Sequence, residues 1–202
     1  MKPTDAFSGL LQLGRPFLTT REAAVRLGVS VSRASQLLRS LEESNLVRKL
    51  RHGLWALKRD VDPFSVPPYL TAPLPSYVSF WSALARHGMI EQVPRRIFVA
   101  TLDRTKQVST TVGTFSIHHL APELFDGYAG SEKDGYLATP EKALFDSIYL
   151  RAPRGAKIFL PELELPRGFQ VDKLDEWASR IAQSRLRTIV SRGVAKALAG
   201  AD

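Results

Sequence analysis

The chain has 202 residues, of which 44% are hydrophobic, so it is long enough to bury one large core or two smaller ones. It has no cysteine, which excludes disulfides, thiolate zinc sites and a cysteine nucleophile. Its 28 basic and 20 acidic residues give a net charge of +8. Residues 1–60 hold most of this surplus, with 11 basic against 5 acidic residues. A basic N-terminal segment favours a polyanionic partner such as nucleic acid.

Residues 17–43 predict two helices joined by a tight turn. Thr19 can cap the first of them, and Glu22 three residues later completes a capping box, because each side chain satisfies a backbone N–H that the first turn leaves unpaired. Gly28 can take the left-handed conformation that ends this helix. Ser30 is then suited to cap a second helix that runs to about Glu43. Two helices separated by so short a turn are typical of a helix-turn-helix.

The second of these helices is amphipathic. Its apolar side chains recur at i, i+3, i+4 and i+7, at Ala34, Leu37, Leu38 and Leu41. The opposite face carries hydroxyl, amide and guanidinium groups, from Ser32, Arg33, Ser35, Gln36, Arg39 and Ser40. DNA phosphates repel carboxylates, whereas Gln and Arg can bond adenine and guanine edges in the major groove. We therefore expect a recognition helix, the alternative being an ordinary solvated face.

A basic hairpin follows directly. Residues 45–50 and 54–58 are β-prone runs around a turn that contains Gly53. The basic side chains of this segment are Arg48, Lys49, Arg51, His52 and Lys58. They are suited to contact backbone phosphates or the minor groove beside a recognition helix, as the wing of a winged helix-turn-helix does. A basic hairpin can also be a solvated edge that is protected against aggregation, but its position after a helix-turn-helix favours the wing.

The chain as a whole is expected to be α+β, with two domains. A first helix, capped by Thr4 or Asp5 and ended by Gly14, completes a winged helix-turn-helix DNA-binding domain at residues 1–62. The prolines of residues 63–68 predict a stiff linker or an extended strap at the boundary. Residues 63–202 are expected to form a mixed α/β domain with helices at 77–87 and 140–150, strands at 96–100, 114–118 and 135–138, and two terminal helices from residue 172 onward.

Three blocks of this second domain resemble a known family. They read SFWSALARHGMIEQVP at 79–94, IFVAT at 97–101 and YLATPEKALFD at 136–146. At this spacing, and behind a winged helix, they are similar to the AbiEi family of antitoxin-type transcriptional regulators. The resemblance implies a repressor that binds an inverted-repeat operator in its own promoter, as a monomer or dimer, and a second domain that counteracts a nucleotidyltransferase-like toxin. A stand-alone winged-helix regulator, or a protein-interaction subunit without antitoxin activity, remains the alternative.

No pattern in the sequence predicts an enzyme or a cofactor. His118 and His119 are neighbours on an expected strand and point to opposite faces, so they cannot chelate one metal ion together. Glu162 and Glu164 alternate with leucines between two prolines, which favours an edge strand with one wet face over a catalytic pair. No apolar run approaches the roughly 18 residues needed to span a bilayer, and no signal peptide is recognisable, so we expect a soluble cytoplasmic protein without a membrane partner.

Overall fold

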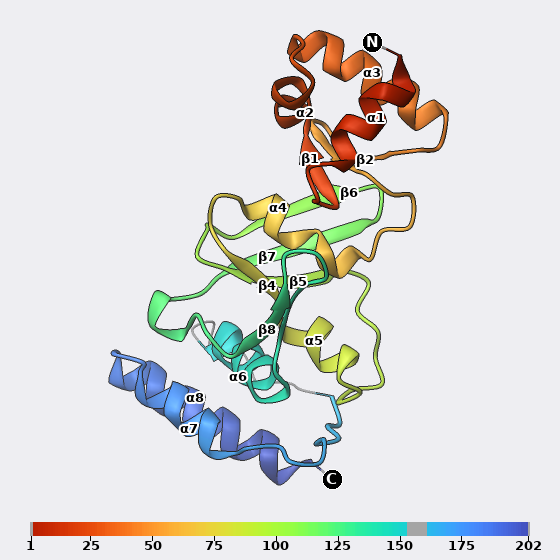
Figure 1. Cartoon of the computed structure of the whole chain (residues 1–202). Coiled ribbons are helices and arrows are strands. Elements are labelled where there is room, and N and C mark those ends of the chain that lie inside the picture. Colours follow the sequence, from red (N-terminus) through yellow and green to blue (C-terminus); the bar gives the residue numbers. More distant parts are fainter. Residues whose placement is uncertain (1, 153–160, 202) are drawn as a thin grey trace.

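Two β-sheets, with helices packed against each, make up the described part of the chain, residues 2–152 and 161–201, in the computed structural model (Figure 1). The architecture is mixed α and β, as the sequence predicts. A three-stranded antiparallel sheet of order β1-β3-β2 belongs to the N-terminal part, residues 2–62, and a six-stranded sheet of order β6-β7-β5-β4-β9-β8 belongs to the C-terminal part, the described residues from 63 on. The elements of the N-terminal part are α1 (Pro3–Leu11), β1 (Phe17–Thr19), α2 (Thr20–Leu27), α3 (Val31–Glu43), β2 (Arg48–Arg51) and β3 (Leu54–Ala56).

Local capping chemistry sets the ends of α2 and α3. The backbone N–H of Glu22 donates to Thr19 Oγ1 at 3.2 Å, and the backbone N–H of Thr19 donates to Glu22 Oε2 at 2.6 Å, so both halves of the expected capping box are formed. Gly28 ends α2 with φ 63°, and the Ser30 hydroxyl caps α3 by accepting from the backbone N–H of Arg33 at 3.2 Å. The expected bounds of both helices are confirmed.

The first helix begins earlier than the sequence suggests. Neither Thr4 nor Asp5 caps α1, because both lie inside it: Lys2 is the capping position and Pro3 is the first helical residue. Proline suits that position, since its missing N–H would have no intrahelical acceptor there. The helix packs on α2, where the Arg26 guanidinium donates to the carbonyl of Gly9 at 3.1 Å.

The proline-rich segment is not the extended strap that we expected. It forms a 3-10 helix, η1 (Pro63–Ser65), followed directly by α4 (Pro67–Thr71). Its prolines occupy first-turn positions, where they break no helical hydrogen bond, and the Asp62 carboxylate accepts from the backbone N–H of Phe64 at 2.9 Å. Ser65, Val66 and Pro67 are buried, so the segment is packed against its surroundings.

In the C-terminal part, the β4–β9 and β5–β7 pairs are parallel and the other neighbouring strands are antiparallel. The helices α5 and α6 pack on one face of this sheet, and α7 and α8 pack against α6 on its outer side (Figure 1). The elements are β4 (Ser76–Val78), α5 (Phe80–Arg86), β5 (Ile97–Thr101), β6 (Lys106–Thr110), β7 (Gly113–His119), η2 (Pro122–Leu124), β8 (Tyr128–Ser131), β9 (Gly135–Ala138), α6 (Pro140–Arg151), α7 (Asp172–Ser179) and α8 (Ser184–Ala199).

Most of the expected elements of this part are present, with two corrections. The strands at 96–100, 114–118 and 135–138, the helix at 140–150 and the two terminal helices are confirmed as β5, β7, β9, α6, α7 and α8. The helix expected at 77–87 is wrong at its start, because Ser76–Val78 is a buried central strand and the helix begins at Phe80. The edge strand expected around Glu162 and Glu164 is reduced to one isolated bridge between Leu163 and Ala201, although both carboxylates are exposed.

The two sheets are joined by a buried apolar cluster, called here the shared cluster. It consists of Phe17, Leu50, Leu54 and Ala56 from the three-stranded sheet and Val66, Leu70, Val99, Phe115 and Ile117 from the C-terminal part. The helices α5 and α6 lie on the opposite face of the six-stranded sheet from this cluster. The division into domains at 1–62 and 63–202 stays a prediction, and the shared cluster argues against independent folding of the first of them, since residues 1–62 alone would expose these side chains.

Candidate nucleic-acid interface

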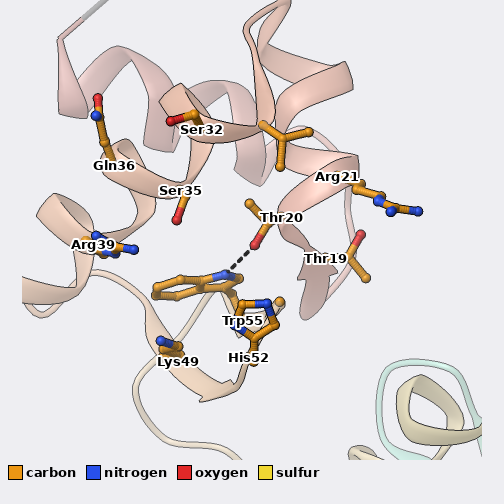
Figure 2. Close-up of a pocket in the computed structure, with 12 residues that line it drawn as sticks. Thr19, Thr20, Arg21, Ser32, Ser35, Gln36, Arg39, Lys49, His52 and Trp55 are labelled. Atoms are coloured by element: carbon orange, nitrogen blue, oxygen red, sulfur yellow. Dashed lines mark hydrogen bonds between the residues drawn. The ribbon is translucent and has the colours of Figure 1, made fainter.

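A groove of about 640 Å³ opens between α3, the start of α2 and the β2–β3 hairpin (Figure 2). Six of the residues that the sequence predicts as an interface line it, namely Ser32, Ser35, Gln36, Arg39, Lys49 and His52. The other lining residues are Thr19, Thr20, Arg21, Val31, Gly53 and Trp55. The groove therefore brings the outer face of α3 and one face of the hairpin into a single concave surface.

The floor of the groove holds its three walls together. Trp55 is only 2% exposed, and its indole N–H donates to Thr20 Oγ1 at 3.0 Å, which joins β3 to the start of α2. Lys49 Nζ lies 5.7 Å from the centroid of the Trp55 ring, within the range of a cation–π contact. The backbone N–H of Lys49 donates to Glu42 Oε1 at 3.0 Å, which joins the hairpin to α3. These contacts fix the groove before any ligand is bound.

The electrostatic character of the groove is basic. Arg21, Arg39 and Lys49 line it, and among the described residues no carboxylic acid does. The nearby Glu22 accepts from the backbone N–H of Thr19 in the capping box of α2 and lies 3.5 Å from Arg15 Nη1, so its charge is paired with a cation outside the groove. Hydroxyl, amide and guanidinium groups beside a positive field can contact both phosphates and base edges of DNA.

Five other predicted residues lie outside the lining of the groove, namely Arg33, Ser40, Arg48, Arg51 and Lys58. Arg33 is exposed on α3 and donates to Gln36 Oε1 at 3.2 Å, so it can orient the Gln36 amide. Ser40 is half-buried on the same helix. Arg51 and Lys58 are exposed, the first at the end of β2 and the second just after β3.

Arg48 does not line the groove, unlike Lys49 on the same strand. Its Nη2 donates to the carbonyl of Thr111 at 2.8 Å, in the turn between β6 and β7. Thr111 also binds the hairpin backbone, with its hydroxyl donating to the carbonyl of Lys49 at 2.8 Å and its N–H to the carbonyl of Leu50 at 2.9 Å. Side chains two residues apart on a strand point to the same face. Leu50 belongs to the shared cluster, so Arg48 lies on the face of the hairpin that is turned to the six-stranded sheet, and Lys49 lies on the other face.

The lining residues that sequence reasoning missed gave weak signals. Arg21 lies in the first turn of α2 beside the capping box, and only the fold places it at the edge of the groove. Val31 lies three residues before Ala34, on the extension of the apolar stripe of α3, and so resembles a core residue. Trp55 was visible only as part of a β-prone run.

A second constellation of polar side chains lies within the C-terminal part and is sealed from solvent. Lys142 and Asp146 are both 0% exposed, and Lys142 Nζ lies 2.5 Å from Asp146 Oδ1. Ser79 Oγ and Tyr77 OH donate to Asp146 Oδ2 at 2.7 Å and 3.1 Å. Burial raises the pKa of Asp146, although Lys142 and the two hydroxyls act in the opposite direction, and burial also raises the pKa of Tyr77. A cluster with all four groups bonded and inaccessible has a structural role.

No known family model and no curated protein matches this chain. The groove is therefore interpreted from its own geometry. Among residues 2–152 and 161–201 there is no group of three or more histidines and carboxylates that could hold a metal ion. None of the helices within those ranges is long and apolar enough to cross a membrane.

Proposed function

We propose that α2, α3 and the β2–β3 hairpin form a winged helix-turn-helix that binds double-stranded DNA. In this proposal α3 enters the major groove, where Gln36 and Arg39 contact base edges, and Lys49 on the wing contacts a phosphate. The observation that carries the proposal is the groove itself, which gathers basic and neutral polar side chains from three elements without a single carboxylate among its lining residues. A surface that contacts only solvent usually carries carboxylates beside its basic side chains.

The biological role that we propose is transcriptional repression by an antitoxin-type regulator. The resemblance of residues 79–146 to the AbiEi family supports a repressor that binds an inverted repeat in its own promoter, and a C-terminal part that counteracts a nucleotidyltransferase-like toxin. No catalytic step is included in this role. The chain would act by binding alone.

DNA binding is tested by fluorescence-anisotropy titration on duplexes selected from a random pool. Lys49→Ala should weaken binding to every duplex and reduce the salt slope by about one, because one phosphate contact is lost. Arg48→Ala is the matched control, since it removes the neighbouring basic side chain, which bonds Thr111 outside the groove, and it should leave the slope unchanged. Equal effects of the two variants would mean that the groove is not the interface. Failure of the wild-type chain to bind any duplex at low salt would contradict DNA binding altogether.

The recognition helix is tested on the same duplexes. Arg39→Ala should cost about 1–3 kcal/mol on the selected duplex and much less on a scrambled one, because the loss of a base contact affects only the sequence that carries the base. Equal losses on both duplexes would place Arg39 on the backbone.

Antitoxin activity is tested by co-expression with a nucleotidyltransferase-like protein encoded beside this chain, scored as colony survival. The full chain should rescue growth. Arg39→Ala should rescue equally, since the proposal assigns toxin neutralisation to the C-terminal part and DNA binding to the groove. Absence of rescue by the full chain would favour the stand-alone regulator, and loss of rescue in Arg39→Ala alone would make neutralisation depend on DNA binding.

A further inference from the structure

Val31 is an apolar side chain in an otherwise polar groove. It is the first residue of α3, it is 51% exposed, and it lines the groove beside Ser32 and Ser35. The one other hydrophobic lining residue, Trp55, is 2% exposed and forms the floor. Val31 therefore supplies the aliphatic surface that the described groove presents to a ligand.

The core does not account for the position of Val31. The residues of α3 that are buried in the N-terminal part are Ala34, Leu37, Leu38 and Leu41, and Val31 is not among them. Its branched side chain has few rotamers at the start of a helix that Ser30 caps, so its methyl groups are held in place. An apolar group that is held still and half in water gains free energy when a ligand covers it with another apolar group.

The major groove of DNA offers one group of that kind. Base edges there present hydrogen-bond donors and acceptors, and thymine adds the C5-methyl group. The N-terminal residues of a recognition helix are those that reach base edges, and Val31 is the first residue of α3. We propose that Val31 packs on the C5-methyl group of a thymine and thereby makes the protein prefer thymine at that base pair. This inference rests on the proposed function, because it requires α3 to lie in the major groove.

The geometry of α3 also places that thymine relative to the other contacts. Val31 and Arg39 are eight residues apart, which is about 12 Å along a helix at 1.5 Å per residue. Base pairs are stacked about 3.4 Å apart. Because a helix in the major groove is inclined to the DNA axis, the thymine read by Val31 should lie at most about three to four base pairs from the position whose preference is lost in Arg39→Ala.

The experiment replaces each thymine of the selected duplex, one at a time, by deoxyuridine, which removes the methyl group and keeps every hydrogen-bonding group. At one position this should raise the Kd of the wild-type protein about fourfold, equivalent to about 0.8 kcal/mol for one buried methyl group. Val31→Ala should bind the thymine and uracil duplexes at that position with equal affinity. Val25→Ala is the matched control, because Val25 is 84% exposed on α2 and does not line the groove, and it should keep the fourfold difference.

Each outcome separates this inference from the proposed function. If the duplex binds but no thymine is sensitive to loss of its methyl group, or if the sensitivity persists in Val31→Ala, the assignment to Val31 is overturned while DNA binding stands. If the wild-type protein binds no duplex, the proposed function fails first and the inference fails with it.

Discussion

Removing the carboxylate of Asp146 should destabilise the protein severely. In Asp146→Ala the ammonium group of Lys142 would stay 0% exposed without its ion-pair partner, with the ring centroids of Phe145 and Trp177 at 5.1 Å and 5.2 Å. Breaking a buried ion pair by deleting one partner costs about 3–5 kcal/mol. That is a large fraction of the roughly 5–15 kcal/mol by which proteins are stable, and it corresponds to an unfolding temperature about 6–20 °C lower for a chain of this size.

The assay is urea unfolding followed by circular dichroism and tryptophan fluorescence. A matched control is Asp103→Ala, because Asp103 Oδ2 lies 2.6 Å from Lys106 Nζ in a pair of similar length whose side chains are 25% and 29% exposed. That variant should lose much less stability, because both charges of this pair reach water and are screened by it. Each carboxylate also accepts other hydrogen bonds, from Tyr77 and Ser79 at Asp146 and from the backbone N–H of Arg104 at Asp103, so the main difference between the two variants is the burial of the pair.

A double variant, Lys142→Met with Asp146→Leu, separates charge from packing. With both charges gone, much of the lost stability should return. Recovery should be incomplete, because the hydroxyls of Tyr77 and Ser79 lose their acceptor, at a cost of about 1–3 kcal/mol each. If Asp146→Ala were no less stable than Asp103→Ala, the Lys142 ammonium would have to reach water, and the reasoning from burial would be refuted.

Two further predictions concern the C-terminal part. Gly127→Ala should lower the unfolding temperature more than Gly168→Ala. Both glycines have positive φ, at 73° and 81°, but of the two only the Cβ at position 127 would clash, because it would lie 2.6 Å from Trp177 Cζ2. Equal shifts would show that backbone strain alone decides the loss of stability. Burial acts to raise the pKa of Glu141, but hydrogen bonds from the backbone N–H groups of Gln170 and of Glu141 itself outweigh burial and hold the pKa below its ordinary value of 4.5. The ionised carboxylate therefore stabilises the folded protein above pH 4.5. This stabilisation is lost as the pH falls through the pKa of the folded state. Glu141→Gln should therefore flatten the decline in unfolding free energy below pH 4.5 in a urea series measured at several pH values, and an unchanged decline would exclude Glu141 as its source.

The parts of the fold that sequence reasoning found are those fixed within one or two helical turns. Thr19, Glu22, Gly28 and Ser30 act on backbone groups at most a few residues away, so the bounds of α2 and α3 could be predicted from local chemistry. The strand β4 could not be found in this way. Its three residues are all buried between β5 and β9, so no exposed face distinguishes the strand, and it is followed after Ser79 alone by the apolar residues of α5.

In the candidate site, too, local sequence predicts some residues and distant segments determine the others. The outer face of α3 follows from helical periodicity, and four of its six predicted residues line the groove. The roles of Arg48 and Lys49 do not follow from periodicity, because the sheet that covers one face of the hairpin is contributed by residues some sixty positions away, around Thr111. Lys142 and Asp146 are four residues apart on α6, but their burial depends on β4 and α7, whose positions local sequence does not determine.

The shared cluster has a consequence for how such a chain can change over evolutionary time. Because Leu50 and Leu54 of the hairpin strands are buried with Val99 and Phe115 of the larger sheet, the two parts fit each other as the halves of one core do. A recombination event that joined this N-terminal part to an unrelated partner would leave those surfaces mismatched. The outer face of α3, which we propose contacts DNA, lies on the opposite side of the hairpin from the cluster, so the packing of the two parts does not constrain it. If the proposal holds, the residues of this face can change, and the DNA sequence that they prefer with them, while the packed surfaces between the two parts are inherited together.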